Sequence, residues 1–134
     1  MLEGSGKPSA ESDLHAALYR LDSAIHCVLH THTVASTVLS RRFPKGIELS
    51  GFEMQKALEG NATHDATITL PVVPNSQDME TLAEHVRSGW PMPWGFLVAG
   101  HGIYAVGDSI ANCRRHLEAI EFLLACALEE SRWS

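Results

Sequence analysis

The feature that most constrains this chain is the stretch Val28-Leu29-His30-Thr31-His32, which closes an apolar run that begins at Ala24. A short apolar run without helix-capping residues predicts a buried β-strand. Because side chains alternate between the two faces of a strand, we expect His30 and His32 on one face and Thr31 on the other. Two imidazoles on one face form half of a metal site. On spacing alone, two ordinary polar histidines remain an equally good interpretation.

A third candidate ligand is His101, which stands between Gly100 and Gly102. Glycine on both sides lets the backbone turn sharply and lets a ligand approach it closely. A histidine in this setting is also typical of a plain turn. If His101 joins His30 and His32, three neutral imidazoles around Zn²⁺ leave the charge of the ion uncompensated and one coordination position open. That arrangement is typical of a catalytic zinc site rather than a structural one.

Two carboxylates are candidates for proton transfer. Glu53 lies between Phe52 and Met54 in a short helix predicted over 51–60. Bulky apolar neighbours would partly desolvate this carboxylate and suit it to general acid–base catalysis, although a solvated helix residue fits the spacing equally well. Glu11 stands in the first turn of a helix predicted over 10–21, where complementation of the helix dipole is the simplest interpretation.

The order of predicted elements defines the fold class. Helices are predicted over 10–21, 33–42, 51–60, 79–87 and 110–128, and strands over 24–30, 47–49, 67–73, 94–99 and 103–106. Alternating short strands and helices predict a layered α/β domain. No boundary indicates a second domain, so we expect one domain over 1–134, with 1–8 flexible because that segment is rich in Gly, Ser and Pro and has little to bury.

Composition excludes several function classes. The chain carries a net charge of −6 with histidine neutral and has no basic cluster, so we expect neither a nucleic-acid partner nor an anionic membrane partner. No apolar run approaches the roughly 20 residues that a membrane-spanning helix needs. Cys27, Cys113 and Cys126 show no metal or disulfide spacing, and no signal peptide is visible, so a cytoplasmic location is expected. Phosphate-loop, dinucleotide-binding and nucleophile-elbow motifs are also missing.

Four motifs together resemble the class II aldolase/adducin family, in particular its methylthioribulose-1-phosphate dehydratase branch. They are Lys7-Pro8-Ser9-Ala10-Glu11, Val28-Leu29-His30-Thr31-His32, Gly51-Phe52-Glu53-Met54-Gln55-Lys56 and Gly100-His101-Gly102-Ile103-Tyr104. The resemblance runs in order from Gly6 to about Leu128. It implies a class II aldolase-like α/β/α domain with a central, mostly antiparallel sheet.

The resemblance also implies a site and a reaction. His30, His32 and His101 would be zinc ligands, and Glu53 the catalytic acid/base. Glu11 matches the catalytic glutamate of the sugar-phosphate aldolase branch. The phosphorylated ketose 5-methylthioribulose 1-phosphate would lose a proton from C3 to Glu53 and its C4 hydroxyl as water, giving 2,3-diketo-5-methylthiopentyl 1-phosphate in methionine salvage. Family members are commonly homotetramers with active sites near subunit interfaces.

One departure from the family leaves alternatives open. Members carry a further N-terminal segment before the Pro-Ser-Ala-Glu motif, including a loop that helps to hold the substrate phosphate. We therefore expect an N-terminally truncated domain, in which metal binding survives while turnover falls. The alternatives are a class II sugar-phosphate aldolase that uses Glu11, and a catalytically impaired fragment or non-catalytic assembly module such as the adducin head. Product analysis would distinguish the aldolase from the dehydratase, and metal analysis would distinguish the non-catalytic module.

Overall fold

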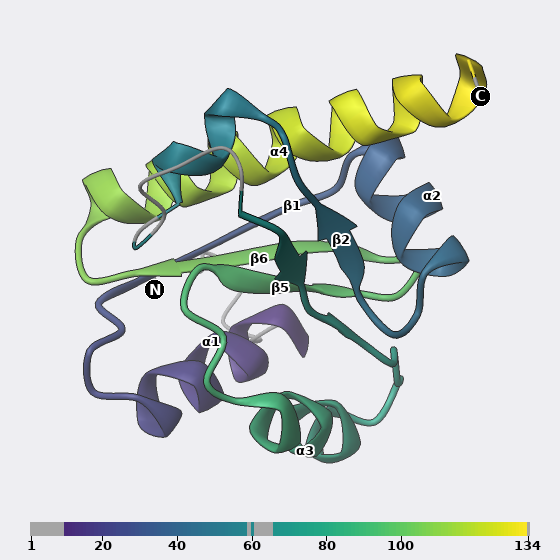
Figure 1. Cartoon of the computed structure of the whole chain (residues 1–134). Helices are drawn as coiled ribbons and strands as arrows, with labels where there is room; N and C mark the ends of the chain where they lie inside the picture. The colour runs from purple at the N-terminus through teal and green to yellow at the C-terminus, as the bar shows by residue number, and fades with distance from the viewer. Residues whose placement is uncertain (1–9, 59, 61–65, 134) are drawn as a thin grey trace.

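The computed structural model describes residues 10–58, 60 and 66–133, and the side chains from residue 14 onward in that part (Figure 1). The flexible segment predicted over 1–8 lies outside the described residues. In chain order the elements are α1 (Ala10–Leu21), β1 (Cys27–Thr31), α2 (Val34–Arg42), β2 (Ile47–Leu49), the 3₁₀ helix η1 (Glu53–Ala57), β3 (Ile68–Leu70), β4 (Val72–Val73), α3 (Met79–Gly89), β5 (Gly95–Val98), β6 (Gly102–Gly107) and α4 (Ile110–Trp133).

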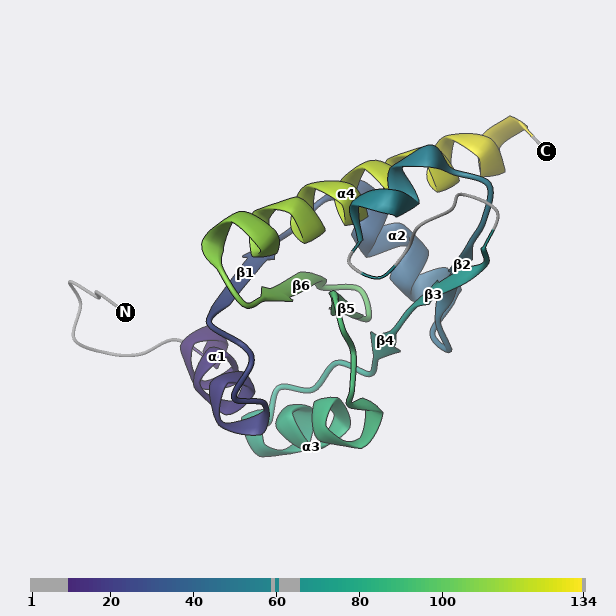
Figure 2. The same cartoon turned by 60° about the vertical axis from the view of Figure 1, so that its left-hand side comes forward.

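The centre of the fold is a sheet with the strand order β1-β6-β5-β4. β6 pairs antiparallel with both β1 and β5, whereas β4 pairs parallel with β5. α1 and α3 cover one face of this sheet, and α2 and α4 lie over the other, as the two views of Figures 1 and 2 show. The predicted α/β/α layering around a mostly antiparallel sheet is confirmed.

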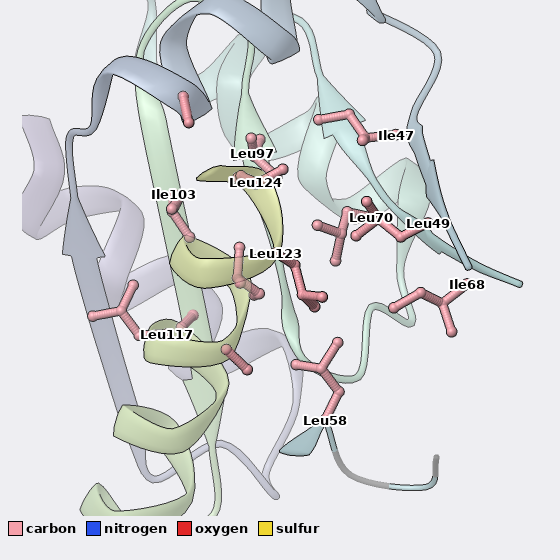
Figure 3. Close-up of a cluster of buried hydrophobic side chains, with 14 of the residues drawn as sticks. Ile47, Leu49, Leu58, Ile68, Leu70, Leu97, Ile103, Leu117, Leu123 and Leu124 are labelled. Carbon is pink, nitrogen blue, oxygen red and sulfur yellow. The ribbon is translucent and has the colours of Figure 1, made fainter. Parts of the chain in front are cut away.

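Each face of the sheet packs into its own core because successive residues of a strand point to opposite sides. On β1, Val28 joins the core under α1 and α3, and its neighbours Cys27 and Leu29 join the core under α4. A second antiparallel sheet, β2–β3, extends the α4 core. Figure 3 shows this extension, where Leu123 and Leu124 of α4 lie among side chains from both sheets.

The strand predicted over 67–73 is divided at Pro71. Proline has no N–H to contribute to a ladder, so a continuous strand ends there. The residues before it form β3 and pair with β2, while the residues after it form β4 and pair with β5. The Pro71 carbonyl still accepts a hydrogen bond from the Leu97 N–H at 2.8 Å. One apolar segment therefore joins the small sheet to the edge of the large one.

Thr31 verifies the predicted alternation at the end of β1. Its hydroxyl donates a 2.7 Å hydrogen bond to Oε2 of Glu121 on α4. Thr31 therefore faces the α4 layer, and the residues on either side of it face the layer of α1 and α3. This orientation decides on which face of the sheet the candidate ligands lie.

No helix within the described part of the chain is long and apolar enough to cross a membrane.

Two of the three cysteines, Cys113 and Cys126, are expected to differ sharply in reactivity. Cys113 is 0% exposed, and burial raises the pKa of its thiol from 9.0 to about 12, whereas Cys126 is only partly buried. Since the thiolate is the reactive form, a thiol reagent at pH 8 should modify Cys126 first and Cys113 only on unfolding. Cys126→Ser should remove the fast phase, and rapid labelling of Cys113 in the folded protein would contradict the assignment.

The same shift sets a direction for stability at alkaline pH. A thiol that keeps its proton in the folded state but loses it in the unfolded state favours folding at low pH. The contribution of Cys113 is complete below pH 9.0 and is lost progressively up to about pH 12.

Candidate metal centre

His30 is held in one orientation by its strand neighbours. It lies on β1 directly opposite Tyr104 of β6, and the two rings stack with centroids 3.9 Å apart and planes at 17°. His30 Nδ1 lies 2.7 Å from the carbonyl oxygen of Ile103. A carbonyl only accepts, so Nδ1 carries the proton and donates, which leaves the Nε2 lone pair for another partner.

The structure brings His32 and His101 to that lone pair. His32 follows β1, and its Nε2 lies 2.9 Å from Nε2 of His30. His101 is in the turn between β5 and β6, and its ring centroid is 5.0 Å from that of His30 and 4.9 Å from that of His32. One ligand nitrogen from each of the three rings lies within 4.8 Å of the other two. These three side chains, here called the histidine triad, come from two segments separated by about half of the chain.

The two glycines beside His101 have distinct roles. Gly100 has a φ of +68°, a left-handed conformation that glycine adopts without strain and that closes the turn. A Cβ at Gly102 would collide with the carbonyl oxygen of Thr31 and would lie 3.0 Å from Cδ2 of His32 and 3.2 Å from Cε1 of His30. Gly102 therefore lets β6 approach β1 closely where the ligands converge.

Gly102→Ala is expected to damage the triad more than the fold. The added methyl group should push β1 away from β6, lower the free energy of unfolding by about 1–3 kcal/mol, and weaken zinc binding at least about tenfold. Zinc affinity by chelator competition and thermal unfolding measure the two effects. Gly89→Ala is the control, because its Cβ would meet only the flexible Met92 side chain at 3.6 Å. Unchanged zinc affinity in folded Gly102→Ala would contradict the close-approach argument.

A cavity of about 470 Å³ opens beside the triad. It combines two of the triad histidines, His32 and His101, with polar groups of the β4–α3 loop and apolar groups of α3. Its lining residues are His32, Thr37, Asn75, Ser76, Gln77, Met79, Leu82, Gly100, His101 and Tyr104. Thr37 and the 75–77 loop were not predicted from the sequence as lining groups. Tyr104 was also not predicted as a lining residue, although the alternation of side chains along a strand places it on the same face of β6 as Gly102.

Of the two candidate carboxylates, Glu53 does not lie with the triad. Glu53 is on η1, which packs against α4, in the layer opposite α1 and α3. Its side chain is 74% exposed and forms a 2.6 Å ion pair with Lys56, so the expected partial desolvation is not found in this chain. Glu11 lies in the first turn of α1 as predicted, and its side chain lies outside the described part.

The triad fits a divalent metal ion of the zinc type. Nitrogen ligands on one tetrahedral zinc lie about 3.3 Å apart, a value between the 2.9 Å of His30–His32 and the 4.8 Å limit of the set. The proton of His30 is already fixed on Nδ1 by a backbone carbonyl, as is usual for metal-ligating histidines. Among the described residues no carboxylate belongs to the set, and three imidazoles alone would leave one position of a tetrahedral zinc for another ligand.

The fold and this site define a class of protein. The sequence model described as the class II aldolase and adducin N-terminal domain matches residues 1–128. The chain belongs to the class II aldolase/adducin family.

Three similar curated relatives carry the name methylthioribulose-1-phosphate dehydratase. The protein of Sorangium cellulosum (strain So ce56) is 53% identical over 129 residues, covering 92% of this chain and 61% of the relative. That of Xanthomonas oryzae pv. oryzae (strain MAFF 311018) is 50% identical over 127 residues, covering 92% and 56%. That of Marinobacter nauticus is 46% identical over 131 residues, covering 94% and 63%. The chain thus spans about three fifths of the length of these relatives.

Solved structures support the same fold. An L-fuculose 1-phosphate aldolase superposes with a TM-score of 0.74 at 22% identity, covering 99% of this chain and 58% of the other. The L-fuculose-1-phosphate aldolase of Thermus thermophilus gives a TM-score of 0.68 at 22% identity, covering 93% and 63%. At this level of identity the likeness concerns the fold alone.

Proposed function

We propose that this chain is part of a zinc-dependent hydro-lyase that dehydrates 5-methylthioribulose 1-phosphate to 2,3-diketo-5-methylthiopentyl 1-phosphate in methionine salvage. The observation that carries the proposal is the convergence of His30, His32 and His101 within 4.8 Å. Relatives with 46–53% identity named methylthioribulose-1-phosphate dehydratase support this choice of reaction within the family.

In this proposal the triad holds the metal and the cavity holds the sugar chain. A zinc ion supplies Lewis-acid polarisation of a substrate carbonyl, which makes the neighbouring C–H acidic. The cavity, at about 470 Å³, lies in the range typical of small-molecule sites. The polar 75–77 loop suits the hydroxyl groups of a ketose, and Met79 and Leu82 suit a methylthio group. The family resemblance assigns the phosphate to a loop of the further N-terminal segment that family members carry.

Glu53 is proposed as the acid/base that takes the C3 proton, acting in the site of a neighbouring copy of the chain. Within one chain it stands in the layer opposite the triad and is 74% exposed. A homo-oligomer with sites near its subunit interfaces, as the family resemblance implies, would bring Glu53 of one copy to the triad of another. Burial in that interface would then supply the desolvation that the single chain lacks. Glu11 is retained as the alternative proton-transfer group.

Product analysis tests the reaction. The zinc-loaded protein is incubated with 5-methylthioribulose 1-phosphate, and mass spectrometry should find a product lighter by one water. Two smaller carbonyl fragments would instead indicate aldol cleavage with Glu11 as the base. A chain that binds zinc but releases no water would overturn the dehydratase assignment, and a chain that binds no zinc would favour an adducin-like assembly module.

A further inference from the structure

We propose that Ser40 is a positioning residue for the metal centre, which fixes His101 through a hydrogen bond from α2 to the β5–β6 turn. The inference rests on the proposed zinc site and adds a group that touches neither the metal nor the cavity.

The contact itself is short and buried on the serine side. The Gly100 N–H donates a 2.9 Å hydrogen bond to Ser40 Oγ, across 60 positions of sequence. Ser40 is 0% exposed, and its own hydroxyl proton is directed at the Thr37 carbonyl at 3.3 Å. The serine oxygen is therefore oriented as an acceptor towards the residue that precedes His101.

α2 is fixed at its other end directly after His32. Thr33 is the N-cap, and it forms a capping box with Ser36, in which the Ser36 N–H donates to Thr33 Oγ1 at 3.0 Å and the Thr33 N–H donates to Ser36 Oγ at 3.2 Å. Such reciprocal bonds hold the first turn of a helix firmly. Ser40 follows Thr33 by about two helical turns. One rigid helix therefore runs from the second triad histidine to the turn that carries the third.

The Ser40 bond holds the middle of the turn, between Val98 and Gly102, which pair in the β5–β6 ladder. His101 N–H donates to the Val98 carbonyl at 2.9 Å, and Gly100 adopts its left-handed φ of +68°. Both views show α2 beside the turn that joins β5 to β6 (Figures 1 and 2). Without the Ser40 bond, an exposed glycine would allow the turn to move, and the distance from His101 to the other two imidazoles would no longer be set.

The test compares zinc binding and coordination in three variants with the wild-type chain. Ser40→Ala removes the acceptor and should weaken zinc binding about 10- to 100-fold, the loss typical for groups that orient metal ligands. Ser40→Thr keeps a hydroxyl and should restore most of the affinity. Ser88→Ala is the matched control, because Ser88 is a helical serine whose hydroxyl bonds only to the local Glu84 carbonyl.

Two readouts separate positioning from general destabilisation. The visible spectrum of the Co²⁺-loaded protein reports the ligand set, and it should change in Ser40→Ala but not in Ser88→Ala. Amide exchange of zinc-free Ser40→Ala should show loss of protection at Gly100 and His101 specifically.

Ser40→Ala is expected to fold, since Gly100 is exposed and water can replace the lost acceptor. Should it not fold, Ser40→Val and Ser40→Thr form a pair of equal shape that differs only in the hydroxyl.

The outcomes are distinct. Wild-type chain that binds no zinc overturns the metal site, and with it this proposal. Wild-type chain that binds zinc, together with folded Ser40→Ala that binds it within about twofold and gives the same Co²⁺ spectrum, overturns the role of Ser40 alone. Weaker binding in Ser40→Ala with rescue by Ser40→Thr supports it.

Discussion

His32→Ala is expected to weaken zinc binding by at least about a hundredfold, since removal of a direct ligand should cost no less than the 10- to 100-fold typical of its outer partners. His32 Nε2 lies 2.9 Å from His30 Nε2 and His32 lines the cavity, so the substitution would remove one of the three proposed ligands. Zinc content after dialysis, together with the affinity from chelator competition, measures the effect. Added zinc should also raise the melting temperature of the wild-type chain and leave that of the variant nearly unchanged.

His26→Ala is the control for this experiment. His26 is an exposed histidine just before β1, so the substitution removes one imidazole without touching the triad. It should bind zinc as the wild-type chain does. Equal zinc binding by His32→Ala and His26→Ala would show that the triad is not the metal centre.

Glu53→Gln is expected to lower turnover about 10²- to 10⁴-fold, the usual contribution of a positioned general acid/base, and to leave zinc affinity unchanged. The amide keeps the shape of the side chain but cannot take a proton. The rate of dehydration and the zinc affinity of the same preparation check the two halves of this expectation. Glu48→Gln, an exposed glutamate on β2, is the matched control and should retain full activity.

Mixing two inactive variants tests whether Glu53 serves a neighbouring copy. In an oligomer assembled from equal amounts of His32→Ala and Glu53→Gln chains, some sites combine an intact triad with an intact Glu53 from the partner. Random assembly should restore about a quarter of the wild-type activity if sites are shared between copies. No recovery in mixed oligomers would place Glu53 in the site of its own chain, against the arrangement proposed above.

Local rules carried much of the prediction. Strand periodicity placed His30 and His32 on one face and Thr31 on the other, because the alternation is a property of the extended backbone. The glycines around His101 indicated a sharp turn with close approach, and both requirements are met by Gly100 and Gly102. The single strand expected over 67–73 is instead divided at Pro71, and its two halves join different sheets.

Non-local features were beyond such rules. Of the two interpretations left open for Glu53, the single chain shows the solvated helix residue, because apolar neighbours in sequence do not bury a side chain whose helix lies on the surface. No motif pointed to Ser40, because a helical serine can accept a hydrogen bond from a turn 60 residues away only when the fold places the two together. The same holds for Asn75, Ser76 and Gln77, which follow a strand as an ordinary loop and line the cavity only through the packing of α3.

By itself, the sequence determined the layered α/β class, the placement of His30 and His32 on the same face of a strand, and the three histidines that could hold a metal. Those results follow from backbone periodicity and side-chain chemistry, which act over a few residues. The tertiary structure decided that His101 meets the other two, because the antiparallel register of β6 with β1 sets Tyr104 opposite His30 and brings the turn before β6 to the end of β1. Register depends on the packing of both faces of the sheet, and no local stretch of sequence contains that information.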